Sequence, residues 1–254
     1  MIAIQETGIN FTHAGIQGQW KSRLGWNHLL DPHYSKTVNA WNVHSHHQQI
    51  HQYGGTAILA LGPTTFYAAG AGKDPSGLGR WCWTRYRGAD NTHFRIVSFY
   101  RPNVNTQSTE LSVAAQHTRY LYSQKDDRPP RTAFLQDLHT DLESFQSAGD
   151  LLVVCGDMNQ DILSGEITQF FNSLQMKNLT FSRHDPTQAP ATMIRNQSRI
   201  SVDGVWASLS LTLVQGGYLD FDIIPGDHQP IWFDLSYNQV FGHELPTIWR
   251  PQAR

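Results

Sequence analysis

Two oxygen-bearing side chains directly follow a strongly apolar segment in the middle of the chain. The segment 151–155 predicts a buried strand, and Asp157 and Asn159 come immediately after it. Because residues i and i+2 of an extended chain point to the same face, we expect the two side chains to project together from the strand end. A carboxylate and an amide there can orient a water molecule and hold a phosphate oxygen. The alternative is a simple turn, which Asp and Asn also favour.

Other polar side chains stand beside further predicted strands. Glu6 follows a short apolar segment, and its carboxylate oxygens suit a hard cation such as Mg²⁺; the alternative is a solvated carboxylate at a strand end. Asp203 interrupts an apolar segment, and because a buried carboxylate without a partner is costly, we expect it to have one. Asp227 and His228 form a pair that supplies a histidine, whose tautomer and charge an aspartate can fix. Their alternative is a turn that precedes a strand.

In their order along the chain, these residues resemble the motifs of the endonuclease/exonuclease/phosphatase superfamily, whose fold DNase I and the AP endonucleases share. The resemblance covers residues 2 to about 235. The matching segments are Ile4-Gln5-Glu6, Phe99-Tyr100-Arg101-Pro102-Asn103, Gly156-Asp157-Met158-Asn159, Val202-Asp203-Gly204-Val205-Trp206 and Gly226-Asp227-His228.

The resemblance implies a site for Mg²⁺ (or Mn²⁺) and an attacking water molecule. Glu6 would bind the metal ion, and Asp227 would serve the metal site directly or through water. Asp157 would orient or deprotonate the water.

The resemblance also implies how the phosphate would be held. Asn159 and Tyr100 would hold the phosphate group itself. His228 would hydrogen-bond the phosphoryl oxygen and stabilise its developing charge, while Asp203 would orient the imidazole ring.

The expected fold is α/β, a DNase I-like four-layer sandwich in which two mixed β-sheets are flanked by helices. Some predicted strands are joined as hairpins and others alternate with helices, and this pattern favours mixed sheets independently of the resemblance. We expect one domain at residues 1–237, and a tail or linker at 238–254. The family normally opens with a strand whose Asn joins the metal and phosphate network. This chain begins at the following motif, so we expect that strand to be missing. Either the sequence is a fragment, or another segment substitutes for the strand, or activity is impaired; the tail suggests that both ends could be cut from something longer.

Periodicity and turn residues predict the individual elements. Strands are expected at 2–5, 56–61, 80–87, 93–100, 151–155, 192–194, 200–208 and 231–235, and helices at 108–124, 132–147 and 166–174.

Composition restricts the substrate. The formal net charge is −2 and the pI is about 6.7, which excludes a surface that is basic overall. A polyanion would therefore have to bind to a local basic patch or to a bound cation. We expect a divalent-metal-dependent phosphodiesterase, a DNA endonuclease, with nucleic acid as its partner and DNA preferred to RNA. The segment 242–251 is similar to segments of retroelement reading frames, which favours an endonuclease of retroelement type.

Two other functions stay open. The first is hydrolysis of a phosphomonoester or a phospholipid by the same fold, and the second is a catalytically impaired remnant that only binds nucleic acid. The chain shows neither a signal-peptide pattern nor an apolar stretch of ~20 residues. We therefore expect an intracellular protein, with the nucleus included, that does not enter a membrane.

Three further clusters deserve a structural test. The segment 44–51 is rich in histidine, and His47 and His51 have the spacing of a helical metal pair, although a polar surface loop is the simpler interpretation. The segment 80–87 interleaves basic and aromatic residues, which could stack on bases or place tryptophans in the core. The acidic segment 137–141 is expected to be a solvated helix face.

Overall fold

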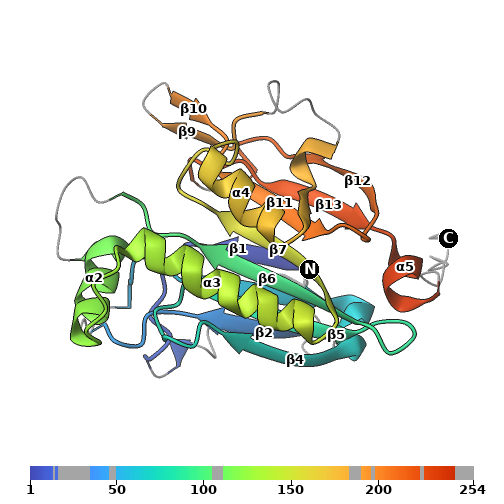
Figure 1. The fold of residues 1–254 in the computed structure, drawn as a ribbon, viewed down its shortest axis with the longest axis horizontal. Coiled ribbons are helices and arrows are strands. Elements are labelled where there is room, and N and C mark those ends of the chain that lie inside the picture. Colours follow the sequence, from blue (N-terminus) through green and yellow to red (C-terminus); the bar gives the residue numbers. More distant parts are fainter. Residues whose placement is uncertain are drawn as a thin grey trace, which may run out of the picture.

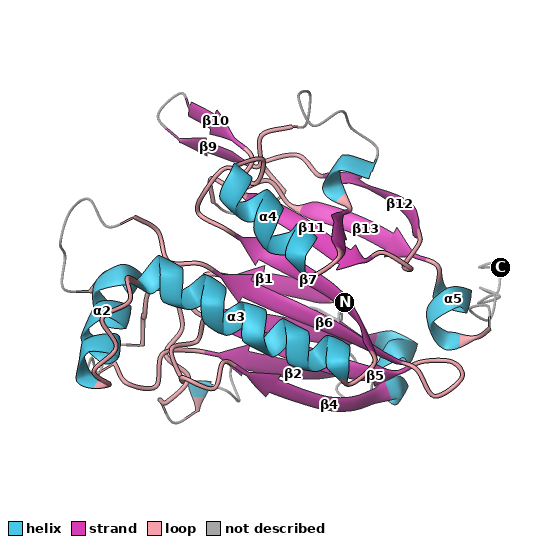
Figure 2. Cartoon of the chain, in the orientation of Figure 1, coloured by secondary structure: helices cyan, strands magenta, loops and turns pink. Residues whose placement is uncertain are grey.

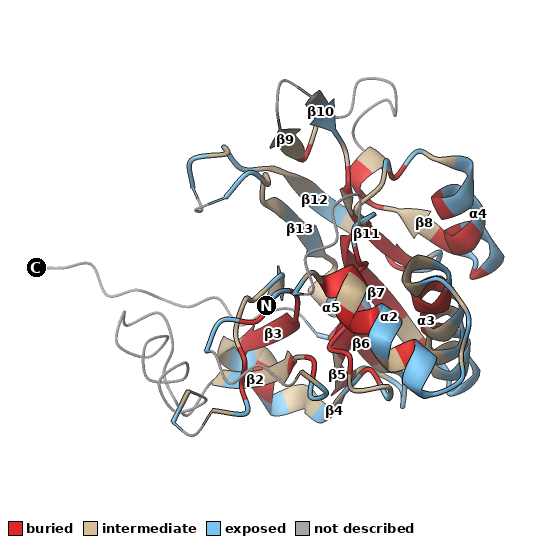
Figure 3. Cartoon of the chain, turned by 90° about the vertical axis from the view of Figure 1, so that its left-hand side faces the viewer, coloured by how far each residue is buried: buried red, intermediate tan, exposed pale blue. Residues whose placement is uncertain are grey.

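The computed structural model describes residues 1–13, 15–16, 35–45, 50–104, 111–182, 190–195, 198–223 and 226–243. The described residues form stacked layers, with helices on one face of a large central sheet and a smaller sheet on the other (Figures 1 and 3). This arrangement confirms the expected α/β fold. None of the helices within these ranges is long and apolar enough to traverse a lipid bilayer.

The central sheet has six strands and is mixed. Its order is β4 (Ala68–Lys73), β5 (Trp81–Arg87), β6 (His93–Tyr100), β7 (Asp150–Asp157), β11 (Asp203–Ser208) and β8 (Met176–Asn178). Only the neighbours β6 and β7 are parallel, and every other pair in this sheet is antiparallel. The inner strands β6 and β7 are buried along nearly their whole length, as expected for strands that are covered on both faces.

Three helices belong to the helical layer, which Figure 2 shows in front of the central sheet. They are α2 (Val113–Ser123), α3 (Pro130–Ser147) and α4 (Gly165–Ser173). Helix α3 presents the fully buried Phe134, Leu138 and Leu142 to the sheet, at the spacing of one helix face. Pro130 occupies its first turn, where a missing backbone N–H costs nothing.

The smaller sheet is antiparallel and packs on the other face of the central sheet. Its order is β1 (Ile2–Gln5), β3 (Thr56–Leu61) and β2 (Ser35–Ala40). Apolar side chains from both sheets, such as Ile58 and Ile96, fill the space between the layers. Two 3₁₀ helices, η2 (Gly62–Tyr67) and η3 (Thr180–Ser182), connect strands.

Two hairpins and a short helix complete the described chain. The hairpins are β9 (Met193–Arg195) with β10 (Ser198–Ile200), and β12 (Leu213–Tyr218) with β13 (Ile231–Leu235); the helix is α5 (Tyr237–Phe241). Among the described strands, β1 pairs only with β3 and β13 only with β12. Val240 and Phe241 of α5 are buried against the inter-sheet core.

Two of the remaining sequence interpretations can be decided. Trp81 is fully buried and packs edge-on against Phe134, and Arg85 pairs with Asp150 at 2.7 Å, so the segment 80–87 serves the core. Asp137, His139 and Asp141 are partly exposed rather than fully solvated, and the two carboxylates have protein partners. Asp137 accepts hydrogen bonds from Arg80 and Arg128, and Asp141 accepts one from the Trp81 indole at 3.0 Å.

Candidate active site

The register of the central sheet brings three predicted site residues together. Asp157 at the end of β7 lies opposite Tyr100 in the parallel pairing with β6, and opposite Asp203 in the antiparallel pairing with β11. Neighbouring strands are about 4.8 Å apart, so the three backbone positions form one short row across the sheet. Residues that are 46 or more positions apart in sequence thus meet because the strands end or begin at the same edge.

Asp157 is the most buried carboxylate of this row, with 3% of its surface exposed. Its Oδ1 accepts the backbone N–H of Asn159 at 2.6 Å. Burial and the charge of Asp203 raise the pKa of Asp157 to about 8, against the opposing effect of that N–H. Close packing here requires glycine before it, because a Cβ on Gly156 would lie 2.0 Å from the Phe99 carbonyl oxygen.

Asn159 adopts a left-handed backbone conformation, with φ of 47°, which asparagine tolerates better than most residues. This turn directs its side chain back toward the end of β6, where Nδ2 donates to the carbonyl oxygen of Arg101 at 2.7 Å. The Asn159 amide also lies within hydrogen-bonding reach of the Tyr100 phenol. Residues 157–159 therefore form a tight turn, which was the alternative interpretation of this segment, rather than the extended strand end from which both side chains were expected to project.

Glu6 joins the site from the smaller sheet. The Tyr100 hydroxyl donates to its Oε1 at 3.2 Å. Just before it, Gln5 donates to the Ser98 hydroxyl, which in turn donates to the Ile4 carbonyl, so β1 is held against β6 across the two layers. Burial and the neighbouring carboxylates raise the pKa of Tyr100, which keeps the phenol protonated at neutral pH.

His228 and Asp203 form a hydrogen-bonded pair, with 2.7 Å between Nδ1 and Oδ2. Burial alone would lower the pKa of His228, but the hydrogen bond and charge of Asp203 outweigh it and raise that pKa to about 9. The imidazole is therefore charged at neutral pH. Asp227 lies at the rim, half-exposed, with its Oδ1 3.9 Å from the His228 Nε2.

Carboxylates and imidazole supply the donors that could hold a metal ion. Donor atoms of Asp157, Asp203 and His228 lie within 4.8 Å of one another. The Asp203 Oδ2 and His228 Nδ1 already bond each other, which leaves the oxygens of Asp157 and the second oxygen of Asp203 for a cation. The charge of Glu6 also acts on Asp157 and helps to raise its pKa. This cluster therefore differs from the predicted pair Glu6 and Asp227, both of which are exposed; Glu6 is linked to the site through the Tyr100 hydroxyl.

Sequence reasoning missed a pair of arginines behind the site. Arg101 is 2% exposed, and Arg101 and Arg131 both donate to the side-chain oxygen of Gln160, at 2.8 and 2.7 Å. Arg131 also donates to the carbonyl oxygen of Asn159 at 3.3 Å. Burial and the charge of Arg101 lower the pKa of Arg131 to about 10. The adjacency of Arg101 to Tyr100 was the only signal, and Arg131 had none because its role depends on tertiary packing.

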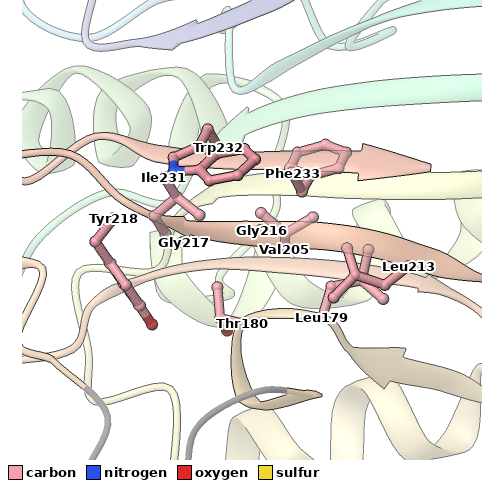
Figure 4. Close-up of a pocket in the computed structure, with 10 residues that line it drawn as sticks. All are labelled: Leu179, Thr180, Val205, Leu213, Gly216, Gly217, Tyr218, Ile231, Trp232 and Phe233. Carbon is pink, nitrogen blue, oxygen red and sulfur yellow. The ribbon is translucent and has the colours of Figure 1, made fainter.

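The other candidate clusters lie elsewhere. His44 bonds the Ser76 carbonyl and stacks on Tyr120, whereas His51 packs edge-on against Tyr53, and the intervening His46 and His47 lie outside the described residues. Figure 4 shows a small apolar pocket under the β12–β13 hairpin, whose lining includes Trp232. None of the predicted site residues lines this pocket.

Comparison with known proteins shows the fold. The sequence matches no protein-family profile and no curated protein. The 3' phosphatase NExo from Neisseria, bound to product DNA hairpin, is 14% identical, with a TM-score of 0.62 over 92% of this chain and 88% of that one. The Xenopus laevis APE2 catalytic domain is 13% identical, with a TM-score of 0.62 over 94% of this chain and 84% of the other.

A third solved structure carries the family's name. The endonuclease/exonuclease/phosphatase family protein from Leptotrichia buccalis is 13% identical, with a TM-score of 0.59 over 93% of this chain and 86% of that one. The likeness extends over nearly the whole chain in all three cases. This chain therefore has the endonuclease/exonuclease/phosphatase fold, the fold of DNase I.

Proposed function

We propose that this chain is a divalent-metal-dependent phosphodiesterase that cleaves DNA internally. One observation carries the proposal: carboxylate, amide, phenol and imidazole groups from distant parts of the sequence gather at one end of the central strands. The groups belong to Glu6, Tyr100, Asp157, Asn159, Asp203 and His228. The DNA hairpin in the NExo structure supports a nucleic-acid substrate.

Asp157 is the group suited to handle the attacking water. Burial raises the pKa of Asp157 in the metal-free protein, and a cation bound beside it would lower that pKa, so that the carboxylate is ionised and can accept a proton from water. Its Oδ1 is fixed by the Asn159 N–H, so the carboxylate has a defined orientation toward a water molecule.

His228 is the group suited to the phosphoryl oxygen. Its Nδ1 is committed to Asp203, which leaves Nε2 as the donor for a substrate oxygen. Because Asp203 holds the ring charged at neutral pH, this hydrogen bond is charge-assisted and strengthens as negative charge develops.

Tyr100 and Asn159 supply neutral donors. The phenol stays protonated, and it can turn its hydrogen from Glu6 to a phosphate oxygen. Asn159 Nδ2 carries two hydrogens, of which the Arg101 carbonyl takes one. Both residues can thus hold a phosphate without adding charge.

The donor set fits a hard divalent cation. The oxygens of Glu6 and Asp157 would hold it, with Asp227 acting from the rim through water. When bound, such an ion neutralises phosphate charge and polarises the phosphoryl oxygen. Asp203 and Glu6 add to the effect of burial in raising the pKa of Asp157, and a cation bound there would offset their negative charge.

A phosphomonoesterase is the second candidate, because the structurally similar NExo is described as a 3' phosphatase. The same donors would then hold a terminal phosphate.

Nicking of supercoiled plasmid tests the proposal. We expect Mg²⁺ or Mn²⁺ to support nicking and EDTA to abolish it. Asp157→Ala should lower the rate at least ~100-fold, whereas Asp161→Ala, an exposed aspartate on the same loop, should not. Circular dichroism verifies that each variant is folded. Release of phosphate from a 3'-phosphorylated oligonucleotide without nicking would favour the second candidate, and binding without either reaction would refute both.

A further inference from the structure

A buried threonine that the proposed mechanism does not use lies between the backbone segments that carry Asp203 and His228. Thr192 has no exposed surface and precedes strand β9. Its hydroxyl oxygen accepts two backbone N–H groups, those of Val202 and Asp203, each at 3.0 Å. One side chain therefore ties down the backbone at the start of β11, from which the Asp203 carboxylate projects.

The main chain around Thr192 holds the histidine end of the pair. The Thr192 carbonyl oxygen accepts the N–H of Gln229 at 2.6 Å, and the Ile194 N–H donates to the carbonyl of Asp227 at 3.1 Å. Between these two bonds, Met193 and His228 face each other in an isolated β-bridge. The segment 192–194 thus binds the backbone on both sides of His228.

The same attachment reaches the loop that carries Asp157. While Thr192 holds the amide of Val202, the carbonyl of Val202 accepts the N–H of Met158 at 2.9 Å. The backbone of Val202 is consequently fixed on both sides. The position of Asp203 relative to Asp157 depends on these two bonds together with the register of β7 and β11.

We propose that Thr192 is a positioning residue for the Asp203–His228 pair. Its side chain fixes Asp203 and its main chain fixes His228, so a single residue sets the 2.7 Å contact between groups that are 25 positions apart. A hydroxyl is required, because only an oxygen with two lone pairs can accept both N–H groups at once. The consequence for catalysis rests on the proposed function, but the positional role does not.

The test compares Thr192→Val, which removes the acceptor at similar volume, with Thr192→Ser, which keeps it. In metal-free protein, NMR of the histidine ring reports the Nδ1–H proton that bonds Asp203. We expect its downfield resonance in wild type and in Thr192→Ser, and its loss in Thr192→Val. In the nicking assay, Thr192→Val should lower kcat about 10- to 100-fold with little change in KM, since small misplacements of catalytic groups act on the chemical step. Thr192→Ser should restore kcat to within about threefold of wild type.

Thr65→Val is the matched control. Thr65 is also buried, and its hydroxyl donates to the Gly62 carbonyl in η2, at the end of β3 away from Glu6. It should lose thermal stability and keep both the resonance and kcat. If Thr192→Val does not fold, Thr192→Ala replaces it, because it removes the hydroxyl without adding an apolar group.

The outcomes separate the two proposals. A resonance that persists in the Val or Ala variant, or that is lost in Thr192→Ser, overturns the positioning role. The resonance can also be present in wild type and Thr192→Ser and absent from the Val or Ala variant while the protein hydrolyses no phosphoester. That result supports the positioning role and refutes the proposed function.

Discussion

Replacement of Asp157 by asparagine should make the metal-free protein more stable, and increasingly so as the pH rises. Burial and the charge of Asp203 raise the pKa of Asp157 from 3.8 to about 8. Between these two values the folded state holds a proton that the unfolded state has released, so stability falls as the pH rises through this range. Asparagine cannot ionise, and it keeps the oxygen that accepts the Asn159 N–H.

The magnitude follows from the two pKa values. Each pKa unit corresponds to about 1.4 kcal/mol, so ionisation costs about 1.7 kcal/mol at pH 5 and about 5.6 kcal/mol at pH 8.5. Structural relaxation and water penetration reduce such differences, and we expect a pH-dependent gain for Asp157→Asn of about 2 to 4 kcal/mol between the two pH values.

Urea denaturation at pH 5 and pH 8.5 in EDTA measures this gain directly. Asp161→Asn makes the same chemical change at an exposed position of the same loop, and should show no comparable gain. A constant difference between wild type and Asp157→Asn at both pH values would show that Asp157 is not held in its protonated form, and the electrostatic account of the site would be wrong.

Two further predictions concern the pair and the turn beside it. Asp203→Asn should lower the pKa of His228 from about 9 toward 6.5, which an NMR titration would measure, and an unchanged pKa would contradict the pairing. The charged His228 adds stability below pH 6.5, and this stability is lost as the pH rises through 9. The variant should therefore lose more stability at pH 6 than at pH 10. Gly156→Ala should prevent folding or cost more than about 3 kcal/mol in thermal or urea denaturation, since its Cβ would lie 2.0 Å from a carbonyl oxygen. Gly165→Ala, where a Cβ meets nothing within 4 Å at the start of α4, should be neutral or stabilising, and equal losses at the two glycines would contradict the close approach.

The site residues could be predicted from the sequence because each lies beside an apolar segment. Asp157 follows a run that the structure buries almost completely, and Asp203 begins the strand beside it. Strand ends are local features, and a carboxylate next to a buried run is visible without knowledge of pairing. Helix α3 was equally visible, because Phe134, Leu138 and Leu142 repeat at helical spacing.

What the sequence did not show depends on contacts between distant segments. Strands β2 and β12 were missed because Ser35–Ala40 and Leu213–Tyr218 alternate weakly and contain polar residues or glycine. The partners of Asp137 were missed because they are arginines from outside its helix. Thr192 lies in a segment with no chemical signal of its own, and only the fold reveals which two amides it accepts.

The pKa values of Asp157 and His228 are both raised, which leaves the carboxyl group of Asp157 neutral and the imidazole of His228 charged at neutral pH. Glu6, Asp157 and Asp203 face a single imidazolium, so the described site holds more acidic than basic groups. The Asp203–His228 pair satisfies itself through its hydrogen bond, whereas burial in the first place, and the charge of Asp203 in the second, raise the pKa of Asp157 to about 8. Arg131 attracts Asp157 from behind the loop, but its guanidinium is occupied by the Asn159 carbonyl and Gln160. A phosphodiester would add another negative charge to this surplus. On the proposed function a divalent cation would offset this negative charge, and we therefore expect substrate binding to depend on the carboxylates of Glu6, Asp157 and Asp203 together rather than on any one of them.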